Sequence, residues 1–197
     1  MKTGTKVLIG IGVIVLLLIM NIIGVNNGLV NRSENVRTAY SNIDTQLQRR
    51  NDLIPNLVAT VQEYMAHEAG IYESITNARA QLAGATTIEE TAEADAALTS
   101  AVNTALRGLL AISEDNPELK ANTNFIQLQD ELAGTENRIA TARRDYNNAA
   151  RENNQYGRRF PASLYISLFG FDFDTVDYFE ASAGARTTPD VGGLFGN

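Results

Sequence analysis

Hydrophobic positions form one continuous run near the N-terminus, and elsewhere they recur at helical spacing. The run covers residues 7–25 (VLIGIGVIVLLLIMNIIGV): Val7 is its first residue, Val25 its last, and Asn21 its only strongly polar member. A helix of this length extends about 28 Å, close to the thickness of the hydrocarbon core of a bilayer. The pattern predicts one membrane-spanning helix that contacts lipid.

Two other interpretations of the run are a cleaved signal peptide and a buried core helix. A signal peptide has a shorter apolar stretch of roughly 7–15 residues and a small-residue cleavage site, whereas here Asn26, Asn27 and Gly28 follow a longer run. The rest of the chain supplies its own apolar faces, so a helix that is apolar on all sides fits lipid better than a core. We therefore expect an uncleaved anchor.

Charged residues beside the anchor bear on its orientation. Lys2 and Lys6 precede it, and Arg32 and Arg37 follow it with Glu34 between them. Positive charge favours the cytoplasmic side, and the two flanks nearly balance. Because the N-terminal tail is short and has no acidic residue, we expect the N-terminus inside and the rest of the chain on the extracytoplasmic side of the cytoplasmic membrane.

Residues 36–82 carry apolar side chains in alternating steps of four and three. Such a 3.5-residue repeat keeps one helix face against a partner helix, as in coiled coils and long bundles. We expect one long helix that is kinked, and not ended, at Pro55, with two shorter helices as the alternative. The seam consists of Val36, Tyr40, Ile43, Leu47, Arg50, Ile54, Leu57, Val61, Tyr64, Glu68, Ile71, Ile75, Ala78 and Leu82.

Further helices follow. Gly84 marks the end of the first, and Thr87 and Glu90 have the spacing of a capping box that opens the second. The second stops at Asn116, after which Pro117 can occupy the first turn of the third. A short fourth helix is expected over residues 162–169. The seam of the third consists of Phe125, Leu128, Leu132, Thr135, Ile139, Ala142, Tyr146, Ala149, Asn153, Tyr156 and Phe160.

Aromatic residues gather near the end of the chain, with seven of the fourteen between residues 160 and 179. They either close the end of the bundle or form an exposed, sticky surface, and we favour closure. Phe171, Tyr178 and Phe179 are the candidate contact residues of this segment. Residues 181–197 are small and Gly-rich, which predicts a flexible tail.

The stretch IDTQLQRRNDLIPNLV, at residues 43–58, is similar to the hallmark of the LemA family of bacterial membrane proteins. Shorter matches follow in the family's order, among them LKAN at 119–122, ENRIA at 136–140 and FP at 160–161. The resemblance covers about residues 30–180. The Gly-rich ending of the chain departs from the common pattern.

The resemblance implies an all-α, single-pass membrane protein with no established enzymatic activity. Residues 1–29 would hold the tail and the transmembrane anchor, and residues 30–180 an up-and-down, coiled-coil-like four-helix bundle. One branch of similar proteins is linked to building magnetosome membranes, and nothing in the sequence assigns the chain to that branch. Family membership predicts a fold better than it predicts a function.

Composition limits the available chemistry. Without Cys and with one His among 197 residues, thiolate nucleophiles, iron–sulfur clusters and His-rich metal sites are excluded. The spacing of Glu63 and His67 suits one helix face, but an adventitious surface pair explains it better than a metal site. We expect no catalytic, cofactor or metal site, and no enzyme. Sixteen basic against 23 acidic residues argue against a nucleic acid partner.

Two charged residues, Arg50 and Glu68, occupy seam positions. At about 27 Å apart along one helix they cannot pair with each other. Each is therefore expected to pair with a polar group on a neighbouring helix and to fix the register of the bundle.

The predicted helices differ in length. The second is about 44 Å long, against about 70 Å for the first and 66 Å for the third. An up-down-up arrangement would then leave residues 36–53 without a partner within the chain. Val36, Tyr40, Ile43 and Leu47 are therefore candidate contacts with other copies or with a partner protein.

These features predict a non-enzymatic helical-bundle protein that scaffolds or self-assembles as a homo-oligomer at the bacterial cytoplasmic (inner) membrane. The alternative is an accessory or adaptor subunit that regulates a membrane protease or transporter. In that case the segment with Phe171, Tyr178 and Phe179 would face the membrane protein partner.

Overall fold

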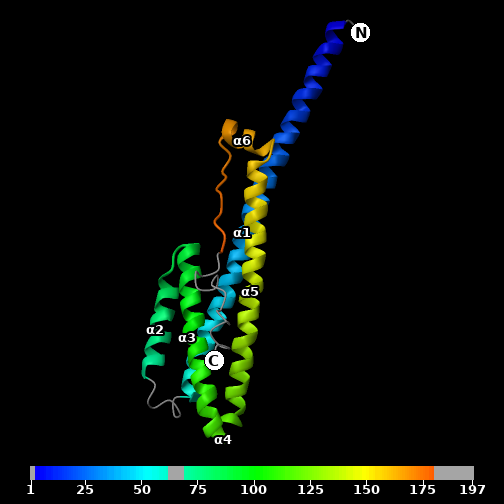
Figure 1. Cartoon of the computed structure of the whole chain (residues 1–197). Coiled ribbons are helices and arrows are strands. Elements are labelled where there is room, and N and C mark those ends of the chain that lie inside the picture. Colours follow the sequence, from blue (N-terminus) through cyan, green and yellow to red (C-terminus); the bar gives the residue numbers. More distant parts are fainter. Residues whose placement is uncertain (1–2, 62–68, 180–197) are drawn as a thin grey trace, which may run out of the picture. The chain divides into compact units, whose positions relative to one another are not determined.

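A computed structural model describes residues 3–61 and 69–179, and within them it contains helices and no strand. The helices are α1 (Thr3–Val61), α2 (Ala69–Gly84), α3 (Ile88–Asp115), α4 (Pro117–Lys120), α5 (Thr123–Arg158) and α6 (Ala162–Phe169) (Figure 1). The prediction of an all-α chain, with one long apolar N-terminal helix followed by several packed helices, is confirmed. The predicted flexible tail, residues 181–197, lies outside the described residues.

The chain forms two compact units. Unit 1 consists of Met1–Ser41 and Arg144–Tyr178, and unit 2 of Asn42–Arg143 and Phe179–Asn197. Both α1 and α5 contribute to each unit. The division into an anchor, a bundle and a tail at residues 29/30 and 180/181 stays a prediction.

The prediction of one helix over residues 36–82 is wrong. Arg79 Nε of α2 donates to Asn51 Oδ1 of α1 at 2.6 Å, although these residues would lie about 42 Å apart in a straight helix. Ile54 and Ile75 also share one core cluster. The alternative of two shorter helices is the correct one, and α1 continues through Pro55 to Val61. Residues 62–68, which include His67 and Glu68, lie outside the described residues.

The predicted helix ends near residue 84 are confirmed. α2 ends at Gly84, and the N-cap of α3 is Thr87, whose hydroxyl accepts from the Glu90 N–H at 3.1 Å. The Glu90 carboxylate in turn accepts from the N–H groups of Thr86 at 2.8 Å and Thr87 at 3.1 Å. These hydrogen bonds, led by that from Thr86, lower the pKa of Glu90.

The start of the third long helix differs from the prediction. Pro117 opens a single turn, α4, and not the long helix. α5 begins at Thr123, where Asn122 Oδ1 accepts from the N–H groups of Asn124 at 3.0 Å and Phe125 at 3.2 Å. Asn122 therefore satisfies N–H groups that the first turn of a helix leaves free. The predicted bounds of the short fourth helix match α6.

Unit 2 has a hydrophobic core that joins the end of α1 to α2, α3, α4 and the start of α5. Five members, Ile54, Ile75, Ala78, Phe125 and Leu132, come from the predicted seams, because a 3.5-residue repeat places them on one face of each helix. The buried residues are Ile54, Ile75, Ala78, Leu98, Ala101, Val102, Ala105, Leu109, Leu119, Phe125 and Leu132.

Unit 1 pairs the first part of α1 with the last part of α5 in antiparallel order. The Tyr40 and Tyr146 rings meet edge to face, with centroids 5.9 Å apart. Toward the other end of this pairing the Arg32 guanidinium lies 3.9 Å from the centroid of the Tyr156 ring. α6 packs on α1 beside them through Ala162, which is buried together with Val25 and Leu29.

After α6 the chain runs back along α5 in an extended conformation (Figure 1). We call residues 171–178 the return segment. Asn154 holds it by both backbone groups of Val176: Oδ1 accepts from the N–H and Nδ2 donates to the carbonyl, each at 2.8 Å. Asn153 Nδ2 donates to the Asp174 carbonyl at 3.1 Å, and the Tyr146 hydroxyl to the Asp177 carbonyl at 2.9 Å. The return segment thus takes its hydrogen bonds from α5 side chains.

Candidate functional site

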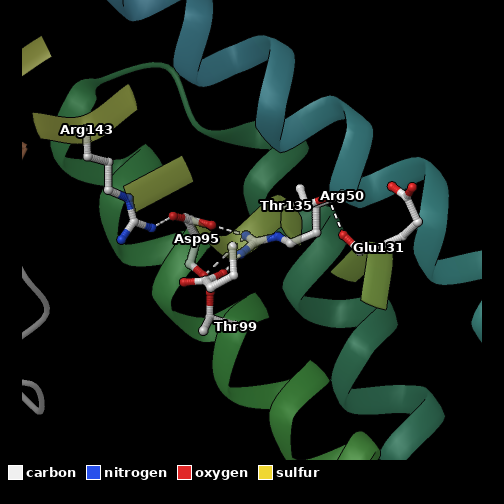
Figure 2. Close-up of polar contacts among 7 residues, drawn as sticks. Arg50, Asp95, Thr99, Glu131, Thr135 and Arg143 are labelled. Atoms are coloured by element: carbon white, nitrogen blue, oxygen red, sulfur yellow. Dashed lines mark hydrogen bonds and ion pairs between the residues drawn. The ribbon is translucent and has the colours of Figure 1, made fainter. Parts of the chain in front are cut away.

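Charged side chains from three helices of unit 2 meet in a cluster around the buried Asp95 (Figure 2). Arg50 comes from α1, Asp95 from α3, and Glu136 and Arg143 from α5. Arg50 reaches the cluster because it occupies a seam position of α1, between Leu47 and Ile54. We call these four charged residues the ionic cluster.

Asp95 lies at the centre of the ionic cluster. Its carboxylate forms ion pairs with the guanidinium groups of both Arg50 and Arg143 and accepts a hydrogen bond from Arg50. Arg50 Nη1 also donates to Thr99 Oγ1 at 2.7 Å and to Glu136 Oε2 at 3.1 Å. Arg50 is 2% exposed and Asp95 is fully buried, so solvent screens neither charge.

The charges of the ionic cluster balance, because two guanidinium groups face two carboxylates. Burial lowers the pKa of the Arg50 guanidinium, and the nearby Glu136 opposes that effect. An arginine starts from so high a value that it stays cationic at neutral pH. The Arg143 guanidinium also lies 4.9 Å from the centroid of the Phe179 ring, a cation–π geometry. The cluster therefore joins α1, α3 and α5 and Phe179.

A cavity of about 330 Å³ lies beside Arg50 in unit 2. Its polar lining residues are Arg50, Thr99, Asn103, Gln129, Glu136 and Asn137. The guanidinium of Arg50 is already paired with two carboxylates, so amides and a hydroxyl are the groups that the cavity offers for hydrogen bonding. The arrangement suits a structural role of the cluster better than proton transfer or nucleophilic chemistry.

The structure confirms that Arg50 pairs with polar groups on neighbouring helices. Its role in fixing register stays a prediction, and Glu68 lies outside the described residues. Glu136 and Arg143 of α5, which the sequence analysis did not single out, also take part in the ionic cluster.

The prediction that residues 36–53 lack a partner within the chain is wrong. Val36, Ile43 and Leu47 are buried, and Tyr40 is half-buried against Tyr146. The physical reason is that α5 contacts this part of α1 through Tyr146, Glu131 and Glu136, and α3 reaches it at Arg50. Contacts of these four residues with other copies are therefore not the reason for their apolar pattern.

The aromatic segment closes the molecule only in part. Phe179 is buried and Phe171 half-buried, whereas Tyr178 is 46% exposed. Phe160 was assigned to the buried seam of the third helix, and it is 80% exposed because α5 ends before it, at Arg158.

Sequence reasoning missed Asp95. Along α3, a spacing of three and then four residues leads from the buried Leu98 back to Asp95 and Thr91. A carboxylate on the buried face of one helix and an arginine on that of another were the available signal. Their pairing follows because a buried charge needs an opposite charge.

A metal site is not suggested by the described residues, which contain no group of three or more His, Asp or Glu side chains placed to hold an ion. The predicted surface pair of Glu63 and His67 lies outside them. Nothing about this pair follows from the structure.

One helix in the described part of the chain is long and apolar enough to cross a membrane, and it is α1. Together with the packed helices, it is consistent with a helical, membrane-associated class of protein. The model of the LemA family matches residues 39–192, which is most of the chain. The protein belongs to the LemA family.

Two similar proteins are the magnetosome proteins MamQ 1 and MamQ 2 of Paramagnetospirillum magneticum. Each is 26% identical to this chain over 183 residues, a match that covers 82% of the chain. The chain spans 66% of the length of these relatives, just under two thirds.

Proposed function

We propose that this chain is a non-enzymatic, membrane-anchored helical-bundle protein that scaffolds or self-assembles at the bacterial cytoplasmic membrane. The proposal rests on the surroundings of α1. This helix of 59 residues begins with an uncovered apolar segment and ends in the hydrophobic core of unit 2.

The exposed apolar side chains of α1 support the membrane anchor. Leu8 is 71% exposed and Leu17 is 60% exposed, and their apolar neighbours along residues 7–23 are similarly uncovered. An apolar surface of this extent is unstable in water and stable in the hydrocarbon core of a bilayer. The same helix then holds the bundle close to the membrane surface, where copies of the chain would be concentrated.

The use of the buried charges supports a non-enzymatic role. Arg50 and Arg143 each pair with Asp95, so the fold needs these charges together, because removal of one would leave a buried charge less compensated. A catalytic acid or base would instead need access to a substrate. The two MamQ relatives are named as magnetosome proteins, and this likeness supports a role in organising a membrane.

The side of the membrane is also part of the proposal. Lys2 and Lys6 on a tail without acidic residues favour a cytoplasmic N-terminus and an extracytoplasmic bundle. A C-terminal alkaline phosphatase fusion, which is active only outside the cytoplasm, should then be active. If this fusion is inactive and a C-terminal fusion to a reporter that works only in the cytoplasm is active, the orientation is the reverse.

Photo-crosslinking in cells tests the scaffold. A photoreactive residue replaces Gln48, which is exposed on α1, and mass spectrometry identifies every covalent product. Copies of the same chain are the expected product. A photoreactive residue at Ile43, which is fully buried, is the matched control and should give no intermolecular product.

Other products would change the assignment. A membrane protease or transporter crosslinked at Gln48 without copies of this chain would overturn self-assembly and support the adaptor role. The absence of any intermolecular product above the Ile43 control would contradict both.

A further inference from the structure

The short helix α6 has an apolar surface that the protein does not cover. Leu164 and Leu168, one turn apart, are 48% and 68% exposed, and the preceding Phe160 is 80% exposed. The sequence of α6, ASLYISLF, contains no charged residue. A helix that exposes such side chains to water would lose the free energy that their burial provides.

Two observations within unit 1 place α6 beside the end of the membrane anchor. The Tyr165 hydroxyl of α6 donates to Asn21 Oδ1 of α1 at 3.0 Å, and Asn21 belongs to the apolar run of residues 7–25. Ala162 of α6 packs with Val25 and Leu29 of α1. Thus α6 lies beside the stretch of α1 where the apolar run ends, with Ala162 and Tyr165 toward α1.

We propose that α6 is an interfacial helix, which lies in the surface layer of the membrane that α1 enters and contacts lipid through Phe160, Leu164 and Leu168. This inference rests on the proposed membrane anchor and adds a second, separate contact with the bilayer. Its occupant is lipid because α6 contacts α1 at Asn21 and Val25, within a segment that itself needs lipid.

The polar neighbours of α6 fit this position. Arg158 and Arg159, both exposed at the end of α5, precede the apolar residues directly and can reach anionic headgroups while α6 contacts acyl chains. Tyr165 has an aromatic body and a hydroxyl, a combination that is enriched at the membrane interface. The hydroxyl also satisfies Asn21, a polar side chain that would otherwise face the bilayer unpaired.

The absence of Trp from the chain makes a clean fluorescence test available. The full chain is reconstituted with Leu168→Trp into vesicles of phosphatidylcholine and phosphatidylglycerol, with and without brominated acyl chains. Leu168 is 68% exposed, so the substitution should leave the fold intact. The expected result is that brominated lipid removes most of the Trp emission, most strongly with bromine near the headgroup.

Two matched variants keep the outcomes apart. Leu17→Trp, in the anchor, should be quenched, most strongly by deeply brominated lipid. Leu110→Trp, at a position of α3 that is 50% exposed, should be quenched only by acrylamide in the water.

Quenching of Leu17→Trp but not of Leu168→Trp by brominated lipid would overturn the interfacial helix and leave the anchor intact. Shielding of Leu168→Trp from both quenchers would show that protein, such as a second copy, covers α6, and would also overturn it. Failure of brominated lipid to quench either position would overturn the anchor and the interfacial helix together.

Discussion

At the scale of single residues, Arg49 and Arg50 are neighbours on α1 with opposite surroundings. Arg49 pairs with Glu131 at 2.8 Å, and both side chains are about half exposed, at 48% and 46%. Arg50 is buried and pairs with Asp95 and Glu136. The two arginines therefore form a matched pair for measuring what burial adds to an ion pair.

Replacement of Arg50 should cost far more stability than replacement of Arg49. Arg50→Met leaves the buried Asp95 with one cation in place of two, a loss of about 3–5 kcal/mol in the free energy of unfolding. Arg49→Met removes an exposed pair and should cost about 0–1 kcal/mol. Urea unfolding of the full chain in detergent, followed by circular dichroism, measures both values. Equal, small losses would contradict the structural role of the ionic cluster.

The hydroxyl of Tyr146 has a raised pKa that can be measured. Burial, with smaller contributions from Tyr40 and Asp177, raises the pKa of its hydroxyl to about 12. The folded state thus keeps a proton that the unfolded state loses near pH 10, so stability should be constant below pH 10 and fall as pH rises toward 12. The phenolate absorbance that titrates near pH 12 should disappear in Tyr146→Phe. A titration curve unchanged by this substitution would place the pKa of Tyr146 among those of the other tyrosines.

The sequence pattern predicted that Arg50 pairs with a polar group on another helix, but it did not identify that group as Asp95. The sequence shows that a charged residue occupies a seam position, which requires a polar partner on another helix. It does not show which helices touch. Asp95 satisfies the same rule on α3, so the pair could have been found by asking which two seams each contain an opposite charge.

At the scale of elements, the return segment depends on side chains of α5. Residues 171–178 form no helix or strand, and Asn153, Asn154 and Tyr146 bind their backbone groups. Gly157 adds a close approach, because a side chain at this position would collide with the ring of Phe173. The extended conformation is thus determined by α5.

Asn154→Ala should release the return segment. The substitution removes two hydrogen bonds to Val176, worth about 1–3 kcal/mol together. Hydrogen exchange of the full chain should become faster in residues 171–178 and stay unchanged in α3. Asn148→Ala, at an exposed position of the same helix, is the control. Unchanged protection of the return segment in Asn154→Ala would show that other contacts hold it.

The sequence predicted the ends of helices well where the residues that begin or end a helix lie within a few positions of each other. Gly84, the capping box of Thr87 and Glu90, and the bounds of α6 are of this kind. The interpretation of residues 36–82 as one helix was wrong because a 3.5-residue repeat indicates which face is buried, not whether the helix continues. Likewise, the repeat could not show that α5 covers residues 36–53.

At the scale of the whole molecule, the two ends of α1 have different surroundings. Residues 7–23 expose apolar side chains, while Ile43 and Ile54 are fully buried within the protein. The proposed scaffold and the proposed interfacial helix both require that the exposed part is covered by lipid. Both proposals therefore depend on the insertion of this part of α1 into the bilayer.

Alkaline carbonate extraction of membranes from cells that express the full chain, followed by peptide mass mapping, tests this claim most directly. Carbonate releases peripheral proteins and leaves membrane-spanning proteins in the pellet. If α1 spans the membrane, the chain should stay in the pellet, and peptides covering residues 7–25 should be recovered from it. A chain found in the supernatant, or one in the pellet that lacks these residues, would contradict the anchor.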